Sequence, residues 1–274
     1  MAIACRALID FMERHFPLEL QEDYDNSGFL VGDADKMIHK AMVCLDVSLD
    51  VIKEASEYGA DIIISHHPLI FNPLRSVTSE NETGRCIMEL VKREIALYSS
   101  HTCFDNAAGG MNAILVRRLG LKNAGVLRII HQEKTGYDGC QLKNSMQSGT
   151  GTYGELEEPC MLIEMAERIK KAFNAPYVTI AGEGTRIVRR AAIVGGSGME
   201  FIKDAALKDC DVLITGDVKH HNALDAIAMG ICVIDAGHYY TEAAAMPELC
   251  RIIAEGTGIE CMVSERSCSP FVCI

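Results

Sequence analysis

The chain carries two series of short apolar runs, and a segment with helical spacing separates each run from the next. The first series lies at 42–46, 61–65 and 95–100, and the second at 187–194, 211–216 and 230–237. The run at 61–65, DIIIS, is too apolar to be half exposed, which indicates a central strand of a parallel sheet. Short helical crossovers make consecutive strands parallel. The sequence therefore predicts an α/β fold with two similar βαβ-type lobes, each with a mainly parallel sheet and helices on both faces.

Local signals predict where one of these helices begins and ends. Ser48 can cap the first turn, and Gly59 suits the position just after the last turn. The residues between them place an apolar stripe on one face, at Val51, Ile52 and Ala55. A second helix is expected around 84–94.

The same rhythm occurs twice, which predicts an internal duplication, although the two halves share little sequence identity. We expect residues 1–125 to form the first lobe, completed by 236–274, and residues 126–235 to form the second. Residues 131–158 are polar and rich in glycine. That composition predicts short strands and turns, or a loop-rich excursion.

The net charge and the cysteine spacing argue against several functional classes. The 274 residues carry a formal net charge of −12 and no basic run, which argues against direct binding to nucleic acid. The 12 cysteines form no C-x-x-C pair, and we expect most of them to be reduced, buried thiols. No apolar run reaches about 18 residues, and Asp10 and Glu13 interrupt the N-terminal stretch, so we predict neither a membrane span nor a signal peptide. The expected location is the cytoplasm.

The third run of each series is followed by the same pattern, a histidine and then an acid four residues later. The first pair is His101 and Asp105, and the second is His238 and Glu242. Ligands of parallel α/β sheets gather at the carboxyl ends of the strands, where both pairs lie. We therefore expect a metal site in a cleft between the two lobes.

His66 and His67 follow the end of the middle run of the first series. Successive strand residues point to opposite faces, so these two rings suit two neighbouring metal ions, unless the chain turns. Two ions about 3.5–4 Å apart need a bridging carboxylate, which Asp105 or Glu242 can supply. Imidazole and carboxylate suit zinc, iron, manganese or nickel better than calcium or magnesium. The alternative for any single histidine is a structural hydrogen bond, and we assign that role or plain exposure to His15, His39, His131 and His220.

Three further motifs leave alternatives open. The glycine turn at 194–201, VGGSGMEF, can present backbone N–H groups to an anion or serve only as a tight turn. Asp46 can lead into a helix or be a cleft acid, and we favour the helix. Asp25 and Asn26 can form an Asx turn or a cleft wall. His221 is intermediate, because it also follows a strand end.

Six sequence blocks together resemble one known family. YDNSGFLVG, SHHPLIF, SHTCFDNAAGGMN, VGGSG, TGDVKHH and DAGHYYTE occur between residues 24 and 242, in the order found in the NGG-interacting-factor-three-like family. The chain departs from that pattern at Ser27, where valine is more usual, and the segment 131–158 matches no block. The resemblance implies a dinuclear metal site whose ligands are His66, His67, Asp105, His238 and Glu242. It makes His101 a further ligand or a residue behind one.

The resemblance also bears on function. Bacterial members of the family are often called GTP cyclohydrolase I type 2 homologues, and the resemblance implies the short form, assembled as a homohexamer. Two metal ions would lower the pKa of a water molecule and present hydroxide as a nucleophile, with His101 or His221 moving a proton. We expect a dinuclear-metal-dependent hydrolase acting on a nucleotide or a phosphorylated small molecule. The alternative is a non-catalytic metal-binding adaptor, or a metal-delivery or regulatory protein.

Overall fold

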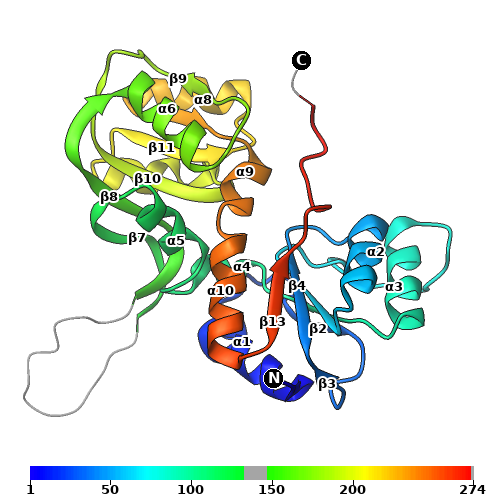
Figure 1. Cartoon of the computed structure of the whole chain (residues 1–274). Coiled ribbons are helices and arrows are strands. Elements are labelled where there is room, and N and C mark those ends of the chain that lie inside the picture. Colours follow the sequence, from blue (N-terminus) through cyan, green and yellow to red (C-terminus); the bar gives the residue numbers. More distant parts are fainter. Residues whose placement is uncertain (133–146, 273–274) are drawn as a thin grey trace, which may run out of the picture. The chain divides into compact units, whose positions relative to one another are not determined.

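The computed structural model describes residues 1–132 and 147–272, and it divides into two compact units (Figure 1). Unit 1 comprises Met1–Phe104 and Ala245–Pro270, and unit 2 comprises Asp105–Ala244 and the residues from Phe271 onward. Unit 1 is therefore built from two separate stretches of the chain. None of the helices in the described residues combines the length and the apolar composition that a membrane crossing needs.

The sheet of unit 1 has five strands, and four of them run parallel. In spatial order they are β13 (Glu260–Val263), β4 (Lys40–Cys44), β5 (Ile62–Ser65), β6 (Ala96–Ser99) and β2 (Gly28–Val31). Only β2 is antiparallel to its neighbour. All residues of β5 are buried in the middle of the sheet, which confirms the predicted central strand. The segments that follow β4, β5 and β6 leave the sheet at the same edge and are therefore neighbours.

Helices cover both faces of this sheet (Figure 1). On one face, α2 (Leu49–Tyr58) and α3 (Glu82–Lys92) share a core with the strands. On the other, α10 (Met246–Thr257) packs on β4 and β13 and contacts α1 (Cys5–His15). The smaller elements are β1 (Ile3–Ala4), β3 (Met37–Ile38), the 3-10 turn η1 (Leu18–Leu20) and α4 (Thr102–Asn106), which crosses into unit 2.

Helix α2 begins and ends as the sequence predicts. The Ser48 hydroxyl accepts the Val51 N–H at 3.2 Å, which caps the first turn. Gly59 then takes the left-handed conformation, with φ 79°, and ends the helix.

The sheet of unit 2 has a parallel centre made of β10 (Ile187–Ser197), β11 (Val212–Gly216) and β12 (Cys232–Asp235). Antiparallel strands extend it at both sides. On one side β8 (Gln147–Met161) pairs with β10, and β7 (Lys122–Gln132) pairs with β8. On the other side β9 (Thr179–Ala181) pairs with β12. The helical elements are α5 (Met111–Arg118), α6 (Leu162–Ala172), η2 (Met199–Phe201), α7 (Ile202–Leu207), α8 (His220–Ala228) and α9 (His238–Ala243). The predicted α/β class is confirmed.

The prediction of short strands and turns is wrong for residues 147–158. They belong to β8, a strand of 15 residues that pairs with β7 on one side and β10 on the other. A Cβ on Gly149 would lie 2.1 Å from the carbonyl oxygen of Arg128 in β7, so glycine permits close contact between these strands. The glycine content that suggested a loop serves strand pairing here. The rest of the predicted excursion, 133–146, lies outside the described residues.

The two units begin their second parallel strand with the same hydrogen-bonding device. Asp61 precedes β5, and its carboxylate accepts the backbone N–H groups of His39 and Lys40 at 2.7 and 3.1 Å. Asp211 precedes β11 and accepts those of two residues of β10, Arg189 and Arg190, at 2.7 and 3.0 Å. This repetition supports the internal duplication that the sequence rhythm predicts.

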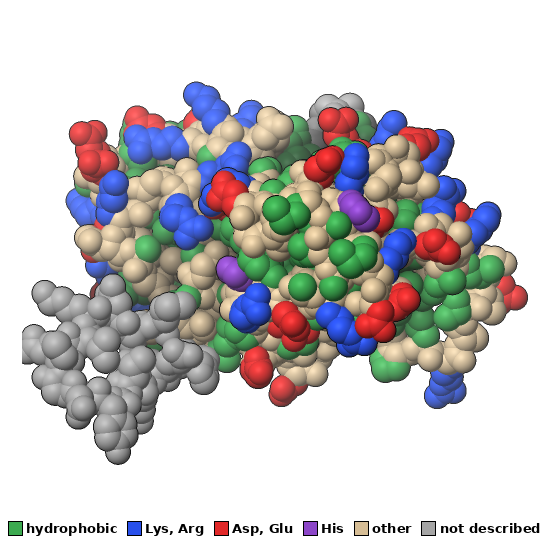
Figure 2. All heavy atoms as spheres, turned by 60° about the horizontal axis from the view of Figure 1, so that its bottom comes forward, with side chains coloured by type: hydrophobic (Ala, Val, Ile, Leu, Met, Phe, Trp, Pro, Cys, Tyr) green, Lys and Arg blue, Asp and Glu red, His purple; other side chains and the backbone are tan. Residues whose placement is uncertain are grey.

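Charges of both signs are mixed on the molecular face shown in Figure 2, where Lys and Arg side chains lie among Asp and Glu side chains. The described part of that face carries no broad basic area. The expectation that the chain does not bind nucleic acid directly, which rests on the net charge of −12, stays a prediction.

The central position of β5 makes a core substitution there costly. Ile63 is fully buried between α2, α3 and the neighbouring strands. We expect Ile63→Ala to lower the free energy of unfolding by about 2–5 kcal/mol, because it leaves a cavity. Thermal unfolding followed by circular dichroism measures the loss. Val91→Ala is the control, because Val91 is 62% exposed on α3 of the same unit, and an equal loss in both variants would contradict the prediction.

Candidate metal centre

Three histidines of unit 1 gather at the carboxyl edge of its sheet. His66 and His67 directly follow β5, and His101 follows β6. The three residues offer ligand atoms that all lie within 4.8 Å of one another. The rings of His66 and His67 are 5.0 Å apart by their centroids. The chain bends after Ser65, so the two side chains do not diverge as they would inside a strand.

The Nδ1 atom of each of these rings has an acceptor beside it. His66 Nδ1 donates to the backbone carbonyl of Ser100 at 2.9 Å. His67 Nδ1 donates to Asp46 at 2.8 Å, and His101 Nδ1 donates to Asp25 at 2.8 Å. Because carbonyl and carboxylate oxygens only accept, Nδ1 carries the hydrogen and the lone pair of each neutral ring is on Nε2. Metal-binding histidines use this arrangement.

Asp25 is the most enclosed of these acceptors, with a fully buried side chain. Burial opposes its ionisation, but hydrogen bonds from His101 and Thr102 outweigh burial and lower the pKa of the carboxyl group. Its carboxylate also accepts the N–H of Asn26 at 2.7 Å. Asp25 therefore orients a histidine of the cluster, a role that neither sequence alternative named.

Asp46 belongs to the cluster, because its carboxylate accepts the hydrogen bond from His67. The favoured interpretation of Asp46 as a helix lead-in does not account for this contact. Two neighbouring backbone N–H groups, of Leu45 and Asp46 itself, both donate to the hydroxyl of Ser267 at 3.1 Å. Ser267 lies in the segment that follows β13. The end of β4, from which Asp46 reaches His67, is thus held by a residue more than two hundred positions later in the chain.

Unit 2 presents its own imidazole and carboxylate. His238 is the first residue of α9, and Glu242 lies one turn later and is 4% exposed. His238 Nε2 is 3.1 Å from a Glu242 oxygen, and His238 Nδ1 donates to Asp217 at 2.7 Å. The hydrogen bond to Glu242 raises the pKa of His238 to about 9 against the effect of burial, and Asp217 adds to the rise. The ring is therefore protonated near neutral pH in the metal-free protein.

Asp105 is tied to the same unit by Asn112 on α5. The Asn112 side chain donates to the Asp105 carbonyl at 3.1 Å and accepts the Gly195 N–H at 3.0 Å. Asp105 itself is half-buried, at the first position of unit 2. This bridge links the backbone of Asp105 to the glycine turn that underlies Glu242.

Comparison with known proteins identifies the family. The sequence profile of DUF34/NIF3 (NGG1p interacting factor 3) matches residues 3–270. The chain belongs to this family. A Clostridium perfringens protein named GTP cyclohydrolase 1 type 2 homolog is 34% identical over 266 residues, covering 96% of this chain and 97% of that protein.

Solved structures agree with this assignment. A Bacillus cereus protein related to NIF3 superposes with a TM-score of 0.91 at 25% identity, over 99% of both chains. A Staphylococcus aureus hypothetical protein gives a TM-score of 0.87 at 31% identity, again over 99% of both chains. The fold and the family resemblance read from the sequence blocks are thus confirmed.

Sequence reasoning on this DUF34/NIF3 chain missed Asp217 and gave Asp46 a cleft role only as the less favoured alternative, although each accepts a hydrogen bond from a histidine Nδ1. Asp46 and His67 are 21 positions apart, and so are Asp217 and His238. In each pair the acid follows one parallel strand and the histidine follows the next strand in the sheet. This repeated spacing was readable from the sequence and would have identified both acids.

The glycine turn in VGGSG makes room for Glu242 and does not offer its N–H groups to an anion. The N–H groups of Gly195, Gly196 and Gly198 donate to side chains of Asn112, Thr241 and Thr215. The tight-turn alternative therefore describes these three positions. A Cβ on Gly196, where φ is 64°, would lie 2.2 Å from a Glu242 oxygen.

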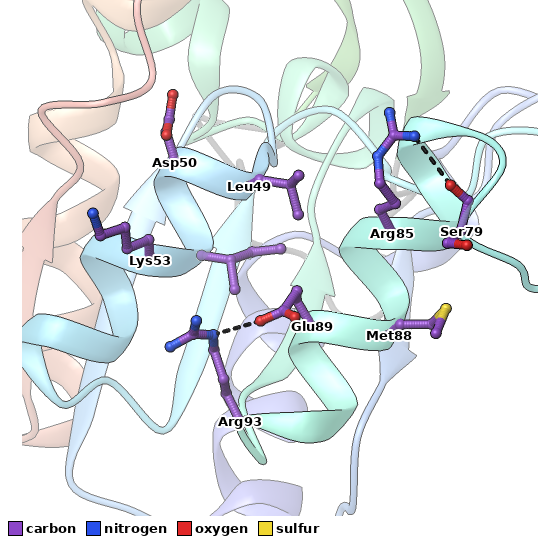
Figure 3. Close-up of a pocket in the computed structure, with 9 residues that line it drawn as sticks. Leu49, Asp50, Lys53, Ser79, Arg85, Met88, Glu89 and Arg93 are labelled. Carbon is purple, nitrogen blue, oxygen red and sulfur yellow. Dashed lines mark hydrogen bonds and ion pairs between the residues drawn. The ribbon is translucent and has the colours of Figure 1, made fainter.

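His220 and His221 belong to neither of the candidate metal-binding groups found among the described residues. His221 is exposed on the first turn of α8, and the exposed His220 precedes it. A cavity of about 490 Å³ in unit 1 contains no histidine in its lining (Figure 3). Both arginines in its lining have fixed partners, because Arg93 donates to Glu89 and Arg85 donates to the Ser79 carbonyl (Figure 3). We assign no ligand to it.

The crowding at Gly196 gives a test of the role of Glu242. We expect Gly196→Ala to displace the Glu242 carboxylate and to weaken metal binding at least tenfold, which corresponds to about 1.4 kcal/mol. Gly120→Ala is the matched control, because φ is 69° there and nothing lies within 4 Å of an added Cβ. Both variants carry the backbone strain of a left-handed alanine, and only the first carries the clash. Equal zinc affinities by isothermal titration calorimetry would contradict the assignment.

The raised pKa of His238 makes metal binding in unit 2 dependent on pH. A metal ion that binds Nε2 must displace the proton held there, so affinity should rise with pH and level off above about 9. Proton release is measured by titrating zinc in buffers of different ionisation enthalpy. The His238→Ala variant should release fewer protons per ion bound, and an unchanged proton count would contradict the prediction.

Proposed function

We propose that this protein binds two divalent transition-metal ions and acts as a metal-dependent hydrolase. One observation carries the metal proposal. Four imidazoles, those of His66, His67, His101 and His238, all have Nδ1 donating to a fixed oxygen acceptor. Histidines with unrelated structural roles have no common reason to donate from Nδ1. Metal ligands do, because this hydrogen bond leaves the Nε2 lone pair for the ion.

The donor set fits such an ion. In unit 1 the donors are the three histidine rings, and in unit 2 they are His238, Glu242 and Asp105. Imidazole nitrogen with few carboxylate oxygens suits zinc, iron, manganese or nickel, while calcium and magnesium prefer all-oxygen sites. His101 shares the ring orientation of its neighbours, which favours a ligand role for it over proton transfer.

A divalent ion held by these residues would polarise a substrate oxygen and lower the pKa of a water molecule toward neutrality. The chain's own groups supply the rest. Asp25 and Asp46 keep two rings in one tautomer and direction, which lowers the reorganisation that ligand binding requires. Glu242, buried beside His238, can hold and return a proton at its carboxylate oxygen.

The surroundings of His101 support a substrate with a flat ring. Phe71 lies 6.2 Å from the His101 ring and Tyr24 lies 6.3 Å from Phe71, measured between centroids. Phe71 is 42% exposed and Tyr24 is 64% exposed, so both rings have accessible faces. Aromatic faces stack on nucleobases. Together with the name of the relatives, this pair favours a nucleotide as substrate.

Elemental analysis of the purified chain tests the metal proposal first. We expect close to two transition-metal ions per chain, and a loss of one or more in His67→Ala and in Glu242→Ala, with the circular dichroism spectrum retained. His39→Ala is the control, because its side chain is 64% exposed and its ring pairs with Asp61. Absence of metal after loading with zinc, iron and manganese would refute the proposal.

Hydrolysis is tested separately on the metal-loaded protein. We expect release of product from a purine nucleoside triphosphate, lost on chelation and restored by the metal. Phe71→Ala should raise KM with little change in kcat, since it removes a stacking surface, while Leu74→Ala on the same loop should not. A chain that holds two ions but turns over no nucleotide would leave metal binding in place and overturn the hydrolase assignment.

A further inference from the structure

Two cysteines of unit 1 lie on a helix and a strand that form one tight reversal of the chain. Helix α10 ends at Gly258, which adopts a left-handed conformation with φ 72°, and the chain returns as β13. Cys250 lies on α10, eight residues before Gly258, which is about 12 Å along a helix. Cys261 lies on β13, three residues after Gly258, which is about 10 Å along a strand. The two residues are therefore level with each other.

They also share one face of the sheet. Met262, next to Cys261, packs into the core on the α2 and α3 side. Because neighbouring strand residues point to opposite faces, Cys261 points to the side where α10 packs on β13. The Cys250 and Cys261 side chains interact, and each shifts the pKa of the other. Both residues are half-buried, so a small reagent can reach them.

The two thiols differ in reactivity. The interaction with the Cys261 side chain lowers the pKa of Cys250 and outweighs the effect of burial. The same interaction, followed by burial, raises the pKa of Cys261. Burial raises the pKa of Cys86 to about 11 and of Cys210 to about 12, so these thiols stay protonated. Cys250 is thus the better nucleophile of its pair.

We propose that Cys250 and Cys261 are a redox modification site that a peroxide converts into an intrachain disulfide. The site is separate from the metal-binding residues and does not depend on the proposed hydrolase activity. Its product would join α10 covalently to β13, the strand at one edge of the unit 1 sheet.

The chemistry balances with hydrogen peroxide as the oxidant. The Cys250 thiolate attacks one peroxide oxygen and the O–O bond breaks, which leaves a sulfenic acid on Cys250. The hydroxide that departs takes up the proton that the Cys250 thiol released and becomes water. The Cys261 sulfur then attacks the Cys250 sulfur, the S–O bond breaks, and a second water leaves. Two thiols lose their hydrogens and two electrons reduce the peroxide. A dithiol reductant reverses the step by exchange.

The test uses the reduced full-length chain. It is treated with an equimolar amount of hydrogen peroxide, quenched with catalase, alkylated with iodoacetamide, digested and analysed by mass spectrometry. We expect a peptide pair linked through Cys250 and Cys261, loss of two alkylatable thiols, and recovery of both with dithiothreitol. Alkylation of both residues after peroxide, with other cysteines oxidised instead, would overturn the proposal in the wild-type chain itself.

Variants separate the two roles. Cys261→Ser should leave Cys250 as a sulfenic acid that dimedone traps, because the second thiol is gone. Cys250→Ser should abolish both the linked peptide and the trapping. Cys268→Ser is the matched control, since Cys268 is exposed without this neighbour, and it should form the disulfide as the wild type does. Dimedone trapping at Cys261 in Cys250→Ser would reverse the assigned order and contradict the proposal.

Discussion

The hydrogen bond from a histidine Nδ1 to a fixed oxygen is the interaction on which the candidate site depends. It sets both the tautomer and the direction of each ring before any ligand arrives. The fold supplies it by a simple rule in both units. An acid follows one parallel strand and a histidine follows the adjacent one, as with Asp46 and His67 or Asp217 and His238. Neighbouring parallel strands end at the same edge of the sheet, so strand pairing by itself brings the acid and the histidine together.

Space is the second requirement, and glycine provides it in unit 2. The positions behind His238 and Glu242 cannot hold a side chain. A Cβ on Gly216 would lie 2.4 Å from the backbone nitrogen of His238, and one on Gly196 would meet the Glu242 carboxylate. The N–H groups of the turn are used internally, by Thr241 and Thr215 among others. The glycine-rich block therefore acts through its missing side chains, which leave space for His238 and Glu242. A phosphate-binding loop, in contrast, acts through its N–H groups.

Much of the fold could be predicted because its signals are local. Apolar runs, the cap at Ser48 and the turn at Gly59 each determine structure within a few residues. The placing of His66, His67 and His101 at one edge of the sheet followed from strand-end topology, and the family from six blocks in order. The bend that brings the His66 and His67 rings together was not predicted. The partners Asp25 and Asp46 were harder, because an acid just before or after a strand can equally form a turn or begin a helix. Strand β8 was missed because its glycines serve contacts with distant strands, which composition does not show.

Unit 1 is discontinuous, and this has a consequence for biosynthesis. Its sheet receives β13 from the far end of the chain, and Ser267 then accepts the N–H groups at the end of β4. Unit 2 is almost entirely one unbroken stretch. On the ribosome, unit 2 can therefore fold while unit 1 still lacks an edge strand. His66, His67 and His101 are translated early, yet the bracing of His67 through Asp46 is complete only when Ser267 has emerged. A nascent chain stalled before residue 260 would expose one side of β4 and depend on chaperones to shield it.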